Sequence, residues 1–270
     1  MSLAVTILGC GSSGGVPRPG LGWGACDPDT PRNRRRRCSL LVERHGEAGV
    51  TRILIDTAPD LREQLLDAGV DRLDAVLYTH EHADHIHGID DLRPLVIHQR
   101  RRMDVWMDEA TSRALHARFG YCFMTPPGSA YPPILQEHRL VPGTPVTLEG
   151  QGGPIAFLPF LLDHGDIPAL GFRFGQVAYT PDVKALPEDS LPALAGLDLW
   201  IVDALRYASH PTHFSVDDAL RWIERLAPRR AVLTNMHADI DYDDIKAKVP
   251  PHVDVAYDGM RLDGLVAPDA

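Results

Sequence analysis

Three imidazoles and a carboxylate lie within six consecutive residues, His80-Glu81-His82-Ala83-Asp84-His85. The cluster follows the apolar run 75–78, which predicts a buried strand with the cluster in the loop that leaves it. Two histidines at i and i+2 point to opposite faces of a strand, so they converge only where the backbone turns. Imidazole suits zinc and related metals, and a carboxylate widens the choice. The cluster therefore predicts a metal site in a loop.

Other histidines and aspartates stand where further predicted strands end. Taken singly, each is explained as a turn or capping residue. Taken together they predict one shared site, because loops at the ends of neighbouring strands converge and the cluster needs closing ligands from elsewhere. Asp56 alone fits either the start of a helix or a carboxylate that orients a metal ligand. The residues are Asp56, His164, Asp182, Asp203 and His237.

Short apolar runs alternate with helical patterns along the whole chain. Residues 120–154 are rich in loops and mark a boundary between two halves, but no linker composition separates them. We therefore expect one domain over residues 1–270, with halves of about 1–150 and 151–270. The strands are predicted at 4–8, 39–43, 52–55, 75–78, 105–107, 155–162, 170–174, 176–179, 199–202, 231–234 and 253–256, and the main helices at 59–69, 109–119, after Ser215 and at 242–248.

The composition is that of an ordinary globular chain, with 270 residues and a formal net charge of −10. The acidic balance gives no basic field for gripping a nucleic-acid backbone. No apolar stretch approaches the ~20 residues of a membrane helix. The first residues lead directly into a strand, so we expect a cytoplasmic protein that does not engage a membrane. The four cysteines lie far apart, which predicts reduced thiols rather than a disulfide framework.

Two further segments have alternative explanations. The loop Gly9–Pro17 is either a tight turn or a backbone that passes close to a site, and in the second case Ser12, Ser13 and Gly14 are candidate substrate contacts. The run Arg32–Arg37 is either a solvated face or a local cationic patch for phosphate. In the second case Arg35 and Arg37 are candidate substrate contacts.

The order Asp, H-x-H-x-D-H, His, Asp, His resembles the pattern of the metallo-β-lactamase superfamily over nearly the whole chain. The resemblance implies a four-layer αβ/βα sandwich of two similar halves with two metal ions at one edge. It assigns one metal to His80, His82 and His164 and the second to Asp84, His85 and His237. Asp182 would bridge both, and Asp56 would support the ligands. We expect two divalent ions, Zn²⁺ first and Mn²⁺ as the alternative.

The opening segment 8–17 resembles the phosphodiesterase branch of that superfamily, which includes tRNA-processing endonucleases and cyclic-phosphate phosphodiesterases. Thr212-His213-Phe214-Ser215 resembles the motif that supplies the acid of this branch. His213 would then protonate the leaving group with Asp203 as its partner, and Asp84 and Asp56 would complete the catalytic set. His210 competes with His213 for the acid role.

Three departures from relatives narrow the expected substrate. His164 and Asp182 lie too close in sequence for a tRNA-gripping arm, which with the acidic charge argues against tRNA. Cys26 and Cys38 are too few for the structural zinc of the cyclic-phosphate enzymes, and the C-terminal helical domain of the thioesterases is missing. We expect a binuclear phosphodiesterase for a small cyclic or nucleotide-like phosphodiester. The alternatives are a thioesterase or lactonase, an RNA-processing nuclease, and a zinc-stabilised binding module; the oligomeric state is open, with a homodimer allowed.

Overall fold

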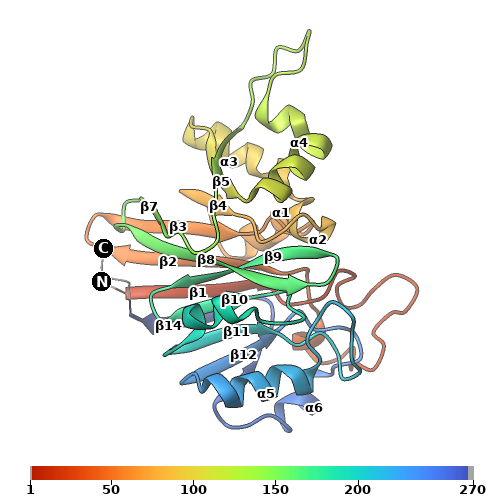
Figure 1. Cartoon of the computed structure of the whole chain (residues 1–270). Coiled ribbons are helices and arrows are strands. Elements are labelled where there is room, and N and C mark those ends of the chain that lie inside the picture. Colours follow the sequence, from red (N-terminus) through yellow and green to blue (C-terminus); the bar gives the residue numbers. More distant parts are fainter. Residues whose placement is uncertain (1, 267–270) are drawn as a thin grey trace.

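Two β-sheets pack face to face between two groups of helices in the computed structural model, which describes residues 2–266 (Figure 1). The first sheet has the spatial order β14 (Met260–Leu265), β1 (Ser2–Gly9), β2 (Ser39–Gly46), β3 (Gly49–Ile55), β4 (Ala75–Leu77), β5 (Met103–Met107) and β6 (Leu135–Arg139). The second has the order β13 (Val253–Val255), β12 (Arg230–Thr234), β11 (Leu199–Asp203), β10 (Val177–Thr180), β9 (Ile167–Phe174), β8 (Ile155–His164) and β7 (Val146–Leu148).

The helices lie outside the sheets. On the side of the first sheet are α1 (Leu61–Asp67), α2 (Ala83–Ile86), α3 (Arg93–Gln99) and α4 (Glu109–Phe123), and on the side of the second are α5 (Val216–Leu226) and α6 (Tyr242–Lys246) (Figure 1). Short 3₁₀ turns occur at Pro31–Asn33, Ile89–Leu92 and Glu188–Leu194. Helix α5 begins at a capping box, because the Ser215 hydroxyl accepts from the Asp218 N–H and the Asp218 carboxylate accepts from the Ser215 N–H.

Both sheets use the same pairing pattern. From β14 to β6 the first sheet has three antiparallel pairs and then three parallel pairs, and the second sheet repeats this from β7 to β13. The predicted αβ/βα sandwich of two similar halves is confirmed. The parallel strands β3, β4 and β10 to β12 all end at the same edge of the molecule, where the candidate active site lies.

Side-chain alternation along the strands divides the core into two layers. In β1, Leu3, Val5 and Ile7 are buried between the two sheets. Leu8 joins a second cluster that the first sheet makes with α1, α3 and α4. Because both faces of the first sheet are covered, the ends of its strands are held rigidly where they carry polar side chains.

Three strands lie where the sequence predicts loop or gives no signal. Strands β6 and β7 fall inside the segment 120–154, and β14 follows the last predicted strand. The short β7 has one fully buried residue, Leu148, and β6 is an edge strand with a mostly polar sequence, so neither shows a strong apolar alternation. Strand β14 is fixed by antiparallel pairing with β1, a long-range contact that no local pattern reveals.

Candidate active site

Four predicted ligands meet at the edge where the parallel strands end. His80 and His82 follow β4, His164 ends β8, and Asp182 follows β10. One potential ligand atom from each lies within 4.8 Å of the others. His82 Nδ1 is 3.0 Å from His80 Nε2 and 3.2 Å from His164 Nε2, and His164 Nε2 is 3.5 Å from Asp182 Oδ2. The convergence predicted for strands distant in sequence is present.

The two oxygens of Asp182 face different groups of histidines. Oδ2 lies 3.7 Å from His80 Nε2, on the side of His164. Oδ1 lies 3.2 Å from His85 Nε2, which is in turn 3.7 Å from Asp84 Oδ2. A carboxylate between two sets of donors has the arrangement of a bridging ligand.

A buried carboxylate orients the histidines from behind. Asp56 Oδ2 is 2.7 Å from His85 Nδ1, and Asp56 accepts hydrogen bonds from both the N–H and the hydroxyl of Thr79. The Thr79 hydroxyl also lies 2.9 Å from His80 Nδ1. Such contacts fix the ring orientation and leave the Nε2 atoms for a metal. Asp56 thus lies where a carboxylate that supports the metal ligands is expected. Thr79 hydrogen-bonds to Asp56, and this partner was not identified from the sequence.

Protonation states favour metal binding on the His80 side. Burial lowers the pKa of His80 well below its usual value, and burial also lowers the pKa of His164. Both imidazoles are therefore neutral, as a ligand must be. Burial opposes a charge on His85, but the carboxylates of Asp182, Asp56 and Asp84 raise its pKa well above the usual value.

The donor set fits divalent cations. His85 Nε2 is buried and, among the described residues, makes no aligned hydrogen bond although Asp182 Oδ1 is near. A bound cation between this nitrogen and the carboxylate oxygens would account for the missing hydrogen bond. His80, His82, His164 and Asp182 would hold one ion, and Asp84, His85 and the other oxygen of Asp182 would be part of the ligand set of a second ion.

His237 lines the same cavity as Asp84 and Asp182 but does not belong to the group formed by His80, His82, His164 and Asp182. Its Nε2 contacts Arg18 Nη1, and its Nδ1 lies 3.0 Å from Asp239 Oδ1. Arg18 comes from the glycine-rich opening and reaches His237 because Gly14 has no side chain: a Cβ there would lie within 2.5 Å of the Arg18 guanidinium. Arg18 therefore contacts the histidine that the resemblance assigns to the second metal.

His213 and Asp203 form the predicted pair beside Asp182. His213 Nδ1 is 2.8 Å from Asp203 Oδ2, and its Nε2 is 3.9 Å from Asp182 Oδ2. Burial alone would lower the pKa of His213, but Asp203 raises it to about 9, so this imidazole carries a proton at neutral pH. His210 differs because burial and neighbouring cations, His213 first among them, lower its pKa. The electrostatics favour His213 over His210 as a proton donor.

Asn235 links Asp203 to Asp182. It is buried at the end of β12 with a φ of 61°. Its Nδ2 lies 3.2 Å from Asp182 Oδ1, 3.2 Å from Asp203 Oδ1 and 3.0 Å from the Pro181 carbonyl. The Asn235 amide has two N–H protons for these three acceptors. It therefore holds the carboxylates of Asp182 and Asp203 close to each other. Sequence reasoning placed Asn235 at a strand end but gave it no role.

A cavity of about 510 Å³ opens above these groups. Ser12 and Ser13 of the glycine-rich loop line it, and the buried Ser12 hydroxyl has no hydrogen-bond partner among the described residues. Two cations also line it, Arg18 and Arg206. Neither arginine belongs to the run Arg32–Arg37, so the sequence analysis did not identify the cationic side chains that line this cavity.

Arg35 and Arg37 do not line this cavity. Arg35 is fully buried, and its guanidinium lies 3.3 Å from both the His237 carbonyl and Asn33 Oδ1. Arg37 pairs with Asp60 at 2.9 Å. Both guanidinium groups are thus engaged by the protein, and the arginines that line the cavity are Arg18 and Arg206 instead.

A family model described as the beta-lactamase superfamily domain matches residues 51–236, more than half of the chain. The chain belongs to the metallo-β-lactamase superfamily. The solved structure of a diphosphatase from the PhnP family has 34% identity and a TM-score of 0.88, with 99% of each chain covered. Human tRNase Z, short form, has 17% identity and a TM-score of 0.64 over 98% of this superfamily member and shows the shared fold. The resemblance drawn from the sequence is confirmed.

Two curated relatives are about one third identical to this superfamily member over their aligned segments. An octanoyltransferase of Porphyromonas gingivalis (strain ATCC BAA-308 / W83) is 34% identical over 260 residues, which are 94% of this chain and 50% of the relative. A ribonuclease Z of Bradyrhizobium sp. (strain ORS 278) is 33% identical over 177 residues, 61% of this chain and 51% of the relative. The chain spans about half the length of these relatives. Within residues 2–266, no helix is long and apolar enough to cross a membrane.

Proposed function

We propose that this protein is a binuclear metal-dependent phosphodiesterase that hydrolyses a small cyclic or nucleotide-like phosphodiester. The observation that carries the proposal is the position of Asp182. Its oxygens face His80 and His164 on one side and His85 on the other, and the protonated His213 lies 3.9 Å from it. A two-sided carboxylate next to a positioned acid fits hydrolysis with proton delivery to a leaving group.

The cavity chemistry supports a phosphate substrate. Arg18 and Arg206 offer planar guanidinium groups that match phosphate oxygens, and the Ser12 hydroxyl is a further donor. The volume of about 510 Å³ suits a small ligand. A neighbour covering 99% of the chain at 34% identity is described as a diphosphatase, which also acts on phosphorus–oxygen bonds.

Each group has a distinct task in this proposal. Two divalent cations held by these histidines and aspartates would supply an activated water at neutral pH and would neutralise charge on the phosphate. His213 donates its Nε2 proton to the departing oxygen, while Asp203 holds the ring through Nδ1. Asn235 fixes Asp203 relative to Asp182. Arg18 and Arg206 orient the phosphate, and Ser12 donates to an oxygen that faces the glycine-rich loop.

A second candidate bond is the phosphoanhydride of a diphosphate, favoured by the description of the neighbour. The leaving group would then be a phosphate, a weaker base than the alkoxide released from most phosphodiesters. Proton donation by His213 matters less for such a group. The curated relative is described as an octanoyltransferase, but the aligned segment is only half of that protein. We therefore do not extend octanoyl transfer to this chain.

A substrate panel tests the proposal. Metal-loaded protein is assayed with bis-p-nitrophenyl phosphate, 2′,3′-cyclic nucleotides, a nucleoside diphosphate ester, a thioester and a lactone. We expect turnover of the phosphodiesters, abolished by chelation and restored by Zn²⁺ or Mn²⁺. Turnover of the thioester or lactone alone would replace the proposal with the other hydrolase class. Activity restored by only one of the two ions would also settle the metal, which a site of nitrogen and oxygen donors leaves open.

A further inference from the structure

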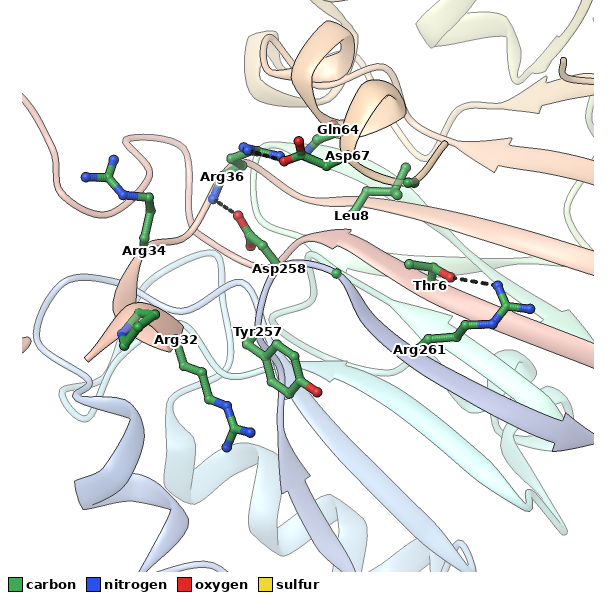
Figure 2. A pocket seen from close by; sticks show the side chains of 13 residues that line it. Thr6, Leu8, Arg32, Arg34, Arg36, Gln64, Asp67, Tyr257, Asp258 and Arg261 are labelled. Atoms are coloured by element: carbon green, nitrogen blue, oxygen red, sulfur yellow. Dashed lines mark hydrogen bonds and ion pairs between the residues drawn. The ribbon is translucent and has the colours of Figure 1, made fainter. Parts of the chain in front are cut away.

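Outside the candidate active site, a cavity of about 480 Å³ lies between β1, α1 and the turn before β14 (Figure 2). Its arginines do not face one ligand. Arg36 is paired with Asp67 at 2.6 Å, and Arg261 is paired with Glu43. The Arg34 side chain points away from the cavity (Figure 2). A polar group that is both oriented and unpaired lies instead in the wall of the active-site cavity, on the loop between β11 and α5.

That loop carries two histidines, and both line the active-site cavity. The ends of the loop are paired, since the Leu205 N–H donates to the Phe214 carbonyl at 3.0 Å. Within the loop, the Arg206 guanidinium donates to the carbonyls of Ala208 and Ser209, at 3.2 Å and 2.7 Å. These hydrogen bonds hold the loop in one shape, so its histidines have fixed positions.

The backbone of Thr212 determines which nitrogen of His210 carries a proton. The Thr212 N–H donates to His210 Nδ1 at 3.3 Å, and the Thr212 hydroxyl lies 3.2 Å from the same nitrogen. Because a backbone N–H can only donate, Nδ1 is an acceptor without a proton, and the proton is on Nε2. Burial and then the neighbouring His213 lower the pKa of His210, which agrees with a neutral ring. Within residues 2–266, Nε2 makes no hydrogen bond.

His210 lies beyond His213, counted from the metal ligands. His213 Nε2 is 3.9 Å from Asp182 Oδ2, and the ring centroids of His210 and His213 are 5.0 Å apart. Among the described residues, the side chain of His210 has no hydrogen bond, ion pair or ring contact with a proposed metal ligand. A phosphate next to Asp182 has its departing oxygen at His213 in the proposed function. The rest of the departing group then extends toward His210.

Thr212 also fixes His210 relative to the metal ligand His164. The Thr212 carbonyl is 2.7 Å from His164 Nδ1 and accepts its proton, while the Thr212 N–H holds His210. The loop approaches this closely because residue 165 is glycine, with a φ of 83°. A Cβ on Gly165 would lie 2.5 Å from Thr212 Cγ2. One residue thus sets the distance between the metal side of the site and His210.

We propose that His210 determines specificity by donating a hydrogen bond from Nε2–H to an oxygen of the departing group, beside the oxygen that His213 protonates. The inference rests on the proposed function. Two rings 5.0 Å apart suit two oxygens on neighbouring carbon atoms. The departing group is therefore a polyol or a sugar with vicinal oxygens. A site built to hydrogen-bond a hydroxyl discriminates against the analogue that lacks it.

Two phosphate monoesters isolate this contact. Glycerol 2-phosphate has a hydroxyl on each carbon next to the ester carbon, and isopropyl phosphate has the same carbon skeleton without these hydroxyls. Isothermal titration calorimetry of the Zn²⁺-loaded protein gives the Kd of each. We expect the wild type to prefer glycerol 2-phosphate about tenfold, equivalent to about 1.4 kcal/mol. His210→Ala should lose this preference by weakening glycerol 2-phosphate alone, and His210→Gln, which keeps an N–H donor, should retain part of it.

The position of the proton is tested without any ligand. The ¹⁵N resonances of the histidine rings, measured by NMR at neutral pH, distinguish a nitrogen that carries a proton from one that does not. We expect His210 to be neutral with its proton on Nε2. A proton on Nδ1 would overturn the proposal, because the ring would then present an acceptor to the cavity.

A control variant and a second comparison keep the result interpretable. His252→Ala removes an exposed histidine that does not line the active-site cavity, so both Kd values should match the wild type. Equal affinity of the wild type for the two monoesters would overturn the proposal, and so would a His210→Ala variant that weakens both alike. Loss of phosphodiester turnover in the substrate panel with the preference intact would refute the proposed function and support the contact made by His210.

Discussion

At the scale of single residues, the histidines of the site differ in charge: some are neutral and one is protonated. His80 and His164 are neutral because burial lowers their pKa values, which prepares them as ligands. His213 is charged because Asp203 raises its pKa to about 9 against the effect of burial. In the proposed function one cluster of histidines serves two roles, as metal ligands and as a proton donor, and the neighbouring carboxylate decides which histidine carries the proton.

The acid role of His213 predicts an effect that depends on the leaving group. His213→Ala should lower kcat by about 10²–10⁴-fold for a phosphodiester with an alkoxide leaving group. It should lower kcat far less for bis-p-nitrophenyl phosphate, whose leaving group needs no proton. Initial rates with both substrates check this, and metal content measured in parallel should equal that of the wild type. Equal losses on both substrates would remove His213 from the acid role.

The link between Asp203 and His213 predicts a change in pH dependence. A general acid must be protonated, so the rate falls as pH rises through its pKa. Asp203 raises that pKa, so Asp203→Asn should move the alkaline fall of kcat to lower pH. The rate at pH values below both limits should change less than the rate at pH 9. A profile whose alkaline limb stays in place would show that Asp203 does not set the charge of His213.

At the scale of elements, the segment 31–37 anchors the loop that carries His237. The Arg35 guanidinium lies 3.3 Å from the His237 carbonyl, the Asn33 amide donates to Asp241 Oδ2 at 2.6 Å, and the Tyr242 N–H donates to Asn33 Oδ1. The Cys26 thiol also contacts the Ile240 carbonyl at 3.2 Å. Hydrogen bonds from a buried arginine and asparagine therefore hold the two loops together.

This anchoring predicts that Arg35→Met weakens the metal site from a distance. The loop that holds His237 would lose its buried partner, and the metal content after dialysis should fall below that of the wild type. Arg34→Ala is the matched control, since it removes the same charge from the other face of the segment and should keep the full metal content. Loss of metal from both variants would point to the net charge rather than to the anchor.

The capping box of α5 predicts a measurable stability effect. Ser215→Ala removes the acceptor of the Asp218 N–H and should lower the free energy of unfolding by about 1 kcal/mol. Urea denaturation followed by circular dichroism measures it, and Ser215→Asp, which keeps a capping oxygen, should lose much less. An unchanged Ser215→Ala midpoint would show that tertiary contacts, and not the cap, fix the start of this helix.

At the scale of the whole molecule, the sequence predicts the sandwich and the central ligands because both rest on strong local patterns. The strands with continuous apolar runs and the H-x-H-x-D-H cluster are visible without any partner. Strand β14 was not predicted, because only pairing with β1 defines it. The roles of Arg18, Arg206 and Asn235 were missed for the same reason, since each depends on a neighbour more than fifty residues away or on the shape of the cavity.

The expectation that Arg35 and Arg37 contact substrate shows a different limit of sequence analysis, in which a visible pattern does not reveal where the side chains lie. A run of arginines shows how much positive charge is present but not which way each side chain points. In an extended backbone, neighbouring side chains lie on opposite faces. The structure sends Arg35 inward and pairs Arg37 with Asp60, while Arg34 and Arg36 line a different cavity. The arginine residue type correctly indicated a concentration of positive charge, but the position of each arginine in the run did not show which way its side chain points.

We propose that Asp182 bridges two metal ions. A crystal structure of the Zn²⁺-loaded protein, with anomalous diffraction recorded at the zinc edge, tests it most directly. We expect two anomalous peaks, one against His80, His82 and His164 and one against Asp84 and His85, with an oxygen of Asp182 at each. We also expect that Arg18 leaves His237 free for the second ion. A single peak at full occupancy, with Arg18 still against His237, would contradict the binuclear site.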